Sequence, residues 1–270
     1  MTELKNRIKA ANKIVIKVGT STVTHPNGKP NIMLIERLVR VISNLVNQGR
    51  HVVLVTSGAI GVGRAKMGQD HKPASIPEKQ ALAAIGQVNL MYIYSKLFSE
   101  YGQTAAQVLL TRDVLDNGVR EQNTINTFNT LLLQYNSIPI VNENDTVSTE
   151  QIEFGDNDTL SAMVAALIRA DLLILLSDID GLYDKDPKNS ADARFIPTVY
   201  GITDEIVSMC GGTNGNLGTG GMKTKIEAAR ICIDAGVPMV IANGDDPENI
   251  NRIISGQELG TLFVPHRKED

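Results

Sequence analysis

The sequence has few of the side chains that build metal centres or disulfide frameworks. It contains two cysteines in 270 residues, Cys210 and Cys232, and they lack the close spacing of metal ligands. We interpret both as buried small hydrophobic residues rather than as a disulfide or a redox pair. The four histidines are equally scattered, which argues against a His/Cys metal cage, and we predict no dedicated metal site on the protein.

The sequence also lacks an excess of positive charge and long apolar runs. The net charge is −4 and the pI is about 5.6, so no basic surface for nucleic acid is expected. Residues 1–13, MTELKNRIKAANK, have no apolar core of a signal peptide. The longest aliphatic run, at 172–176, is too short to span a bilayer. We therefore expect a cytoplasmic protein without a membrane partner.

Hydrophobic residues make up 42% of the chain and form short apolar runs that alternate with longer helical patterns. This alternation predicts βαβ units on a mainly parallel sheet. We therefore expect a three-layer α/β/α sandwich, formed by one domain over 1–270 that divides into two lobes at about 1–168 and about 169–264. The expected strands are 14–18, 52–56, 138–141, 172–176 and 239–242, and the expected helices are 33–47, 77–100, 120–134, 158–169 and 222–234.

Polar and glycine-rich segments follow these strands, at the carboxyl ends where ligands bind in open α/β sheets. In KIVIKVGTS, Lys17 stands between apolar residues near the strand end, and Gly19 follows. Two interpretations stay open: Lys17 reaches solvent at a sheet edge, or it is a fixed cation aimed at phosphate. Ser57 and Gly58 follow the second strand, where backbone N–H groups at a helix start favour an anion. An ordinary strand-to-helix turn also explains them.

Two clusters of Asn and Asp, NEND at 142–145 and GDND at 155–158, lie within seventeen residues of each other. The segment from 142 to 154 is expected to form a β-hairpin or flap outside the main sheet. Either cluster alone could be a turn. Together their amides and carboxylates suit a ligand with an α-ammonium group, and the carboxylates suit a lysine or Mg²⁺.

Two further segments suit a nucleotide. Ser177-Asp178 end a strand and lead into a turn-rich loop at 181–187, which is either a plain surface loop or a cover for base and ribose. Residues 218–225, GTGGMKTK, place three glycines and two lysines at a helix start, as in a phosphate cradle. A flexible glycine loop is the alternative. Lysines there oppose the helix dipole, and a bound anion would explain them.

These features together indicate phosphoryl transfer. Lysines and glycine turns can surround phosphate oxygens, and the chemistry depends on positioning and charge neutralisation. An acceptor carboxylate needs no general base, because it is already ionised at neutral pH. This fits the lack of an obvious histidine base or serine triad.

Seven segments, in this order along most of the chain, resemble the amino acid kinase family. They are KVGTS at 17–21, VTSGAIGVG at 55–63, KQALAAIGQ at 79–87, LLTR at 109–112, NEND at 142–145, FGDND at 154–158 and LGTGGMKTK at 217–225. The resemblance implies use of ATP with Mg²⁺. NEND and FGDND resemble the members that phosphorylate the γ-carboxylate of L-glutamate to L-glutamyl 5-phosphate, the first step of proline synthesis.

The resemblance also implies a role for individual residues. Lys17 and Lys225 resemble the catalytic lysines that neutralise the transferring phosphoryl group, and Asp158 resembles the carboxylate that organises them. The residues that would bind glutamate are Ser57, Gly58, Asn142, Asp145, Asp156 and Asn157. The residues that would bind ATP are Lys17, Ser177, Asp178, Thr219, Gly220, Gly221, Met222, Lys223, Thr224 and Lys225.

The same resemblance implies proline as a feedback inhibitor, glutamyl-phosphate reductase as a possible partner, and a homo-oligomer (dimer or tetramer). Many relatives continue into a PUA domain, whereas this chain ends at Asp270, so we expect no PUA domain. Two alternatives stay open. One is a sister kinase acting on acetylglutamate or aspartate. The other is a non-catalytic amino-acid or nucleotide sensor, which the absence of either lysine or of Asp158 would favour; all three are present.

Overall fold

The computed structural model describes residues 2–111, 114, 118–147, 157–187, 189–190, 192–209 and 221–265. Eight strands of this part form one sheet, in the order β3-β4-β2-β1-β5-β9-β10-β8. β10 pairs antiparallel with β9, and the other neighbouring strands of the sheet pair in parallel. The strands are β1 (Lys13–Val18), β2 (His51–Val55), β3 (Ala105–Leu110), β4 (Ile138–Glu143), β5 (Leu172–Ser177), β8 (Thr198–Val199), β9 (Met239–Asn243) and β10 (Thr261–Phe263), and β6 (Leu182–Tyr183) pairs separately with β7 (Phe195–Ile196).

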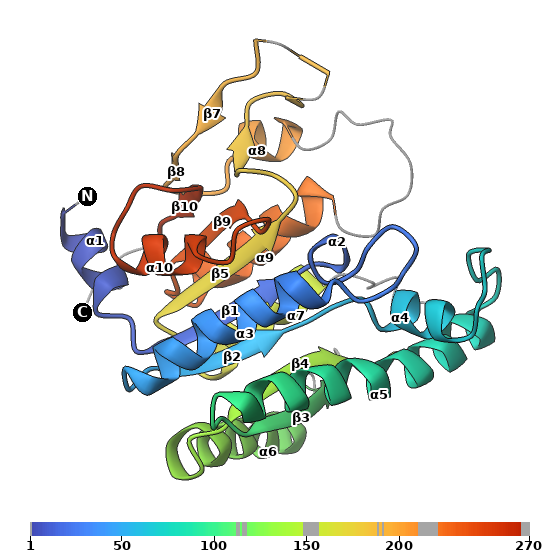
Figure 1. Ribbon diagram of the computed structural model, residues 1–270. Coiled ribbons are helices and arrows are strands. Elements are labelled where there is room, and N and C mark those ends of the chain that lie inside the picture. Colours follow the sequence, from blue (N-terminus) through green and yellow to red (C-terminus); the bar gives the residue numbers. More distant parts are fainter. Residues whose placement is uncertain are drawn as a thin grey trace.

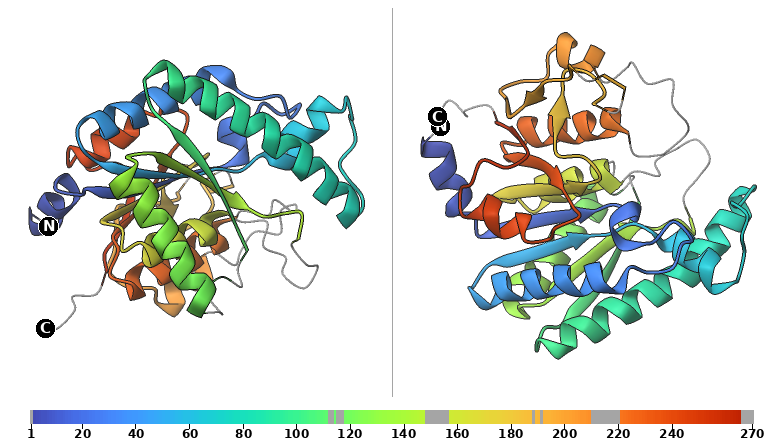
Figure 2. Two further views of the ribbon diagram at one scale, coloured as in Figure 1. Left: turned by 90° about the horizontal axis from the view of Figure 1, so that it is seen from below. Right: turned by 45° about the horizontal axis from the view of Figure 1, so that its top comes forward.

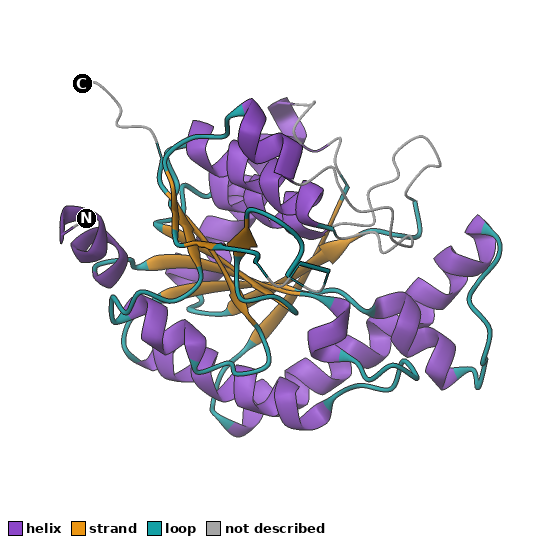
Figure 3. Ribbon diagram, turned by 90° about the horizontal axis from the view of Figure 1, so that it is seen from above, coloured by secondary structure: helices purple, strands orange, loops and turns teal. Residues whose placement is uncertain are grey.

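Helices cover both faces of the sheet, which gives the expected three layers (Figures 1 and 3). One face carries α1 (Thr2–Lys9), α2 (Thr20–Val23), α3 (Ile32–Asn47), α4 (Ala59–Lys66), α5 (Ile76–Glu100) and α10 (Asn249–Ile254). The other carries α6 (Gly118–Asn129), which continues as a π-helical turn at Thr130–Gln134, together with α7 (Asn157–Leu167), α8 (Asp204–Met209) and α9 (Met222–Asp234). None of the helices in the described part of the chain has the length and apolar character needed to cross a membrane.

The alternation of side chains along each strand explains why both faces are covered. In β1, Ile14 and Ile16 pack among residues of α3 and α5, whereas Val15 packs among residues of α7 and α9. Because both sets are buried, the strand reads as an unbroken apolar run. The left view of Figure 2 shows these two helical layers with the sheet between them.

β1 lies between β2 and β5, so the chain crosses the sheet in both directions from this strand. Such a point of reversal opens a crevice beyond the carboxyl ends of the strands, where ligands bind in this class of sheet. In register, Lys17 of β1 lies beside Val55 of β2 and Leu175 of β5. The segments that follow these three strands therefore meet at one edge of the sheet.

Two glycines allow α4 and α5 to approach closely beside this edge. A Cβ atom at Gly86 would lie 1.7 Å from the carbonyl oxygen of Ala59, and one at Gly63 would lie 1.9 Å from that of Leu82. Any larger residue would clash with backbone, so these glycines set the distance between the helices. α5 itself begins with a capping box: Ser75 accepts from the N–H of Glu78, and Glu78 accepts from that of Ala74.

The sequence predicted the main elements, with some corrections. All five expected strands are present, and the five expected helices correspond to α3, α5, α6 with its π-helical turn, α7 and α9. Asn142 and Glu143 extend β4, so they are not part of a hairpin, and residues 148–156 lie outside the described residues. The strands β3, β6, β7 and β8 and the helices α1, α2, α8 and α10 were not predicted. The proposed division into two lobes stays a prediction.

Candidate active site

Asp158, in the first turn of α7, lies between two lysines. Its Oδ1 is 2.5 Å from Lys17 Nζ, and its Oδ2 is 2.9 Å from Lys225 Nζ. The three side chains are buried, with exposed fractions of 1% for Asp158, 8% for Lys17 and 6% for Lys225. Burial on its own raises the pKa of the carboxyl group, but the two ammonium groups outweigh it and lower the pKa of Asp158 below its usual value. The carboxylate is therefore ionised, and the site holds two cations and one anion.

Three elements bring these charges together. Lys17 comes from the central strand β1, Asp158 from the start of α7 and Lys225 from the start of α9. A carboxylate is favourable at a helix N-terminus, whereas Lys225 at the same position opposes the dipole and needs its partner. The interpretation of Lys17 as an exposed lysine at a sheet edge is wrong, because β1 is central and the side chain is buried. Thr224 Oγ1 lies 3.3 Å from Asp158 Oδ2 as well.

Asn157, the neighbour of Asp158, connects the ends of three elements through its amide nitrogen. Its Nδ2 lies 2.6 Å from the Thr56 carbonyl oxygen, 2.9 Å from Ser57 Oγ and 2.8 Å from Asn142 Oδ1. Asn142 in turn donates to Gln87 Oε1 at 2.8 Å. The predicted substrate-binding residues Ser57, Asn142 and Asn157 are thus brought into one hydrogen-bonded group.

Gly58 provides the turn between β2 and α4. Its φ of 96° lies in the left-handed region, which favours glycine over residues with a side chain. A Cβ atom there would also lie 3.0 Å from Val23 Cγ2. The turn allows α4 to begin at Ala59, directly after Gly58, as expected for a strand followed by a helix start. Gly19 separates β1 from α2, and a Cβ atom there would lie 3.7 Å from Lys17 Nζ, so its backbone is close to the ammonium group.

Asp145 follows β4 and is half-buried. Burial raises the pKa of Asp145 to about 6. The carboxylate is therefore mostly ionised at neutral pH, but its ionised form lowers the stability of the folded protein unless a cation lies beside it. An ammonium group of a ligand would compensate for this cost.

The residues predicted to bind ATP lie on two elements. Ser177 ends β5, and its Oγ is 3.2 Å from Asp178 Oδ1. Gly221 precedes α9 in open space, with no atom within 4 Å of an added Cβ, and as a glycine it has no side chain with which to cap the helix. Met222, Thr224 and Lys225 are partly or fully buried in the first turn, whereas Lys223 is exposed. Asp156, Thr219 and Gly220 lie outside the described residues, as does Cys210.

Sequence reasoning did not select two residues of α5 that reach this site. Gln87 contacts Asn142, and the Tyr94 hydroxyl lies 2.9 Å from Thr56 Oγ1 in the buried core. Both stand on the sheet-facing side of α5, seven residues apart, which places them two turns apart on one face. Gln87 ends the KQALAAIGQ segment, so a polar residue on the buried face of an apolar helix was the available signal.

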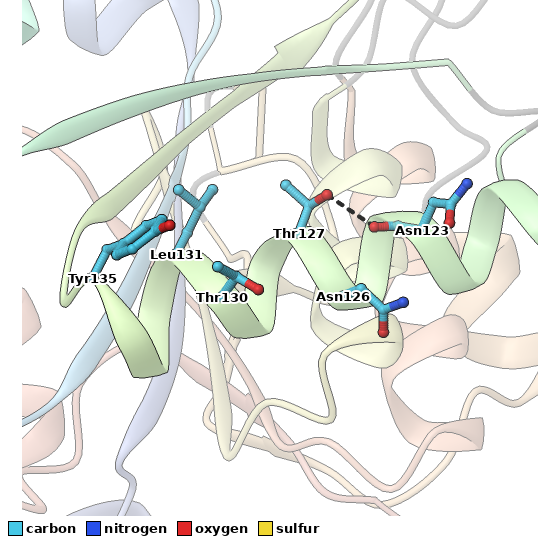
Figure 4. Close-up of a pocket in the computed structure, with 6 residues that line it drawn as sticks. All are labelled: Asn123, Asn126, Thr127, Thr130, Leu131 and Tyr135. Atoms are coloured by element: carbon cyan, nitrogen blue, oxygen red, sulfur yellow. Dashed lines mark hydrogen bonds between the residues drawn. The ribbon is translucent and has the colours of Figure 1, made fainter.

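A separate hollow lies along α6 and contains none of the predicted site residues (Figure 4). Four of its six lining residues have polar side chains, but most of the lining surface is apolar, and Thr127 Oγ1 donates within the helix to the Asn123 carbonyl at 2.9 Å. The residues that line it are Asn123, Asn126, Thr127, Thr130, Leu131 and Tyr135. Within the described ranges, no group of three or more His, Cys, Asp or Glu side chains could hold a metal ion.

Comparison with solved structures supports the fold. UMP kinase from Bacillus anthracis superposes with a TM-score of 0.64 at 15% identity, over 94% of this chain and 96% of that chain. Isopentenyl phosphate kinase from T. acidophilum superposes with a TM-score of 0.62 at 18% identity, over 93% of this chain and 99% of that chain. At these identities the likeness concerns the fold alone.

Comparison with known sequences identifies the family. The model of the amino acid kinase family matches residues 12–243. Glutamate 5-kinase from Clostridium perfringens is 52% identical over 98% of this chain and 100% of that protein. Glutamate 5-kinase from Listeria monocytogenes is 49% identical over 98% of each chain. The chain therefore belongs to the amino acid kinase family, as the motifs at its strand ends predicted.

Proposed function

We propose that this protein is a glutamate 5-kinase, which transfers the γ-phosphoryl group of ATP to the γ-carboxylate of L-glutamate. The observation that carries the proposal is the buried arrangement of Lys17, Asp158 and Lys225, which places two cations at the switch point of the sheet. The relatives named glutamate 5-kinase, at about half identical residues over nearly the whole chain, support the choice of substrate.

In the proposed reaction an oxygen of the glutamate γ-carboxylate forms a bond to the γ-phosphorus of ATP. The bond from that phosphorus to the β,γ-bridging oxygen breaks, and ADP leaves with the bonding electron pair. Lys17 and Lys225 neutralise the charge on the phosphoryl oxygens, and Asp158 holds both ammonium groups in place. No proton has to move, because the acceptor carboxylate is ionised at neutral pH.

The starts of α9 and α4 suit the two anionic ligands. The uncapped N-terminus of α9, with Gly221 and Thr224, offers backbone N–H groups to ATP phosphates. Mg²⁺ bound with ATP would add further charge neutralisation. The turn at Ser57 and Gly58 offers N–H groups at the start of α4 to the glutamate γ-carboxylate. Asp145 and the Asn157 Oδ1 are the acceptors proposed for the α-ammonium group.

The assignment can be tested by trapping the acyl phosphate. Purified protein is incubated with Mg²⁺, ATP and hydroxylamine, together with L-glutamate, L-aspartate or N-acetyl-L-glutamate, and the hydroxamate is measured. We expect product with glutamate and little with the other two. Turnover with aspartate or acetylglutamate but not glutamate would assign a sister kinase instead. ATP binding without turnover of any of them would favour the sensor.

Several expectations, the first from the composition of the chain and the others from the family resemblance, stay predictions. They are a cytoplasmic location, inhibition by proline, transfer of the labile product to glutamyl-phosphate reductase and assembly as a dimer or tetramer. The hydroxamate assay with added proline and light scattering of the purified protein would test the second and the fourth.

A further inference from the structure

Gln87 carries a polar group whose presence the packing of the helix does not explain. Its side chain lies on the buried face of α5, with 8% of the residue exposed. Its Oε1 accepts from Asn142, but its Nε2 is buried and has no hydrogen-bond partner in the described part of the chain. An unpaired buried donor costs stability. An apolar side chain of similar shape would avoid that cost, so the amide calls for another explanation.

The hydrogen bond from Asn142 to Gln87 helps to fix which way the Asn142 amide is turned, and so the orientation of the Asn157 amide bonded to it. Asn142 donates through Nδ2 to Gln87, and its Oδ1 accepts from the Glu143 N–H at 2.9 Å and from Asn157 Nδ2 at 2.8 Å. If the Asn142 amide were reversed, its NH₂ group would face these two donors. The acceptor oxygen of Gln87 opposes that reversal, because it satisfies Nδ2 only in the observed direction.

The direction of Asn142 then sets the direction of Asn157. The three atoms within hydrogen-bond distance of Asn157 Nδ2 are all acceptors, namely the Thr56 carbonyl, Ser57 Oγ and Asn142 Oδ1. Because Oδ1 and Nδ2 leave the same carbon in different directions, the Asn157 Oδ1 points away from this group of acceptors. Among the described residues none donates a hydrogen bond to this oxygen, so it can accept one from a substrate.

We propose that Gln87 is a positioning residue for the amino-acid substrate. Through Asn142 it keeps the Asn157 amide oriented so that its oxygen, and not its NH₂ group, meets the α-ammonium group of glutamate. Gln87 does not touch the substrate in this role. The inference rests on the proposed function, because it assigns the Asn157 oxygen to the α-ammonium group.

The test compares Gln87→Met with the wild-type protein in the hydroxamate assay. Gln87→Met removes one unpaired buried donor but leaves Asn142 Nδ2 without its acceptor, so we expect little change in the thermal midpoint. We expect the KM for glutamate to rise about tenfold, which corresponds to about 1.4 kcal/mol. The kcat and the KM for ATP should change less than about threefold, because the lysines and α9 are unaffected.

A matched control is Asn89→Met on the same helix. Asn89 Nδ2 donates to the Ile85 carbonyl one turn away and makes no contact with the amide chain. This variant should keep the wild-type KM for glutamate. In an Asn142→Ala background, Gln87→Met should add no further increase in KM, because Gln87 acts through Asn142.

The outcomes separate the two proposals. If the wild-type protein shows no turnover of glutamate, the proposed function fails. If the wild type is active and Gln87→Met keeps its KM for glutamate, only the role of Gln87 is refuted. If Gln87→Met raises the KM for glutamate by the same factor in the Asn142→Ala background as in the wild type, Gln87 does not act through Asn142 and the proposal is refuted. Loss of folding in both Gln87→Met and Gln87→Leu would show that the amide is needed for stability, and would also overturn the proposal.

Discussion

Replacing Asp158 by asparagine tests the central arrangement of charges most directly. At an effective dielectric constant of about 20, unit charges at the two observed distances of 2.5 and 2.9 Å attract by about 6 kcal/mol each. Much of this attraction compensates for the removal of the three groups from water. Removing one partner of a buried ion pair typically lowers the free energy of unfolding by about 3–5 kcal/mol. We therefore expect Asp158→Asn to lower the thermal midpoint on the order of 10 °C, given about 2–4 °C per kcal/mol at this size.

The same substitution should separate binding of ATP from catalysis. In the wild-type protein Asp158 competes with the phosphate groups for Lys17 and Lys225. Without that carboxylate the lysines pair with phosphate alone, so the dissociation constant for ATP should stay the same or fall. The kcat should fall at least about 100-fold, because the ammonium groups are no longer held in position. Added ATP should therefore raise the thermal midpoint more in the variant than in the wild type.

Asp171→Asn provides a matched control. Its carboxylate accepts from the backbone N–H groups of Asn12 and Lys13, where β1 and β5 begin, at the end of the sheet away from the lysines. This variant should lose some stability and keep wild-type affinity for ATP and wild-type kcat. Calorimetric titration with ATP and thermal denaturation distinguish the two variants. A tenfold weaker binding of ATP to Asp158→Asn would refute the reasoning, since it would show that Asp158 itself holds the nucleotide. A kcat within threefold of wild type would refute it as well.

Three further predictions follow from other contacts. The pKa of about 6 for Asp145 means that kcat/KM for glutamate should fall tenfold per pH unit below about pH 6, and that this fall should be absent in Asp145→Asn. Because the folded state holds that proton more tightly than the unfolded state, Asp145 costs stability as the pH rises from about 4 to about 6, so Asp145→Asn should raise the thermal midpoint at pH 7.5. Gly86→Ala should destabilise the protein by about 3 kcal/mol or more in urea unfolding and raise the KM for glutamate. The control Gly118→Ala, with no atom within 4 Å of the added Cβ, should change neither the stability nor this KM. Tyr94→Phe should cost about 1–2 kcal/mol in urea unfolding, because Thr56 Oγ1 loses its 2.9 Å hydrogen bond and keeps only the 3.4 Å contact with the Ser57 carbonyl, and should leave kcat within about twofold.

The sequence was sufficient to predict the five neighbouring strands β4-β2-β1-β5-β9 of the sheet and the edge of it that carries the site. Strands that are covered on both faces must be apolar throughout, so β1 and β5 stand out as short unbroken runs. Their carboxyl ends must share one edge if they are parallel, and that alone brings the segments after β1, β2 and β5 together. The edge strand β3 was missed because it is not covered in this way: most of its residues are partly or fully exposed, so it forms no unbroken apolar run.

The pairing within the site could not be predicted in the same way. The position of Lys17 in an apolar strand implies a partner, but several carboxylates follow the strands, among them Asp145, Asp158 and Asp178. The partner is Asp158 because α7 begins beside the end of β1 and faces the first turn of α9, a relation between helices that no local pattern encodes. The family resemblance assigned Asp158 to this role without the geometry.

The contacts made by α5 were beyond both kinds of reasoning, and they show how the fold supports the site. Gly86 allows α4 to approach α5 closely, while Gln87 and Tyr94 of the same helix contact Asn142 at the end of β4 and Thr56 just after β2. A site for phosphoryl transfer works by positioning, so its ligands must stand on elements that cannot shift independently. One long helix that contacts the substrate-side strand ends at two points, two turns apart, meets that requirement. The buried Nε2 of Gln87, which has no partner among the described residues, is then a cost in stability that the orientation of Asn157 explains.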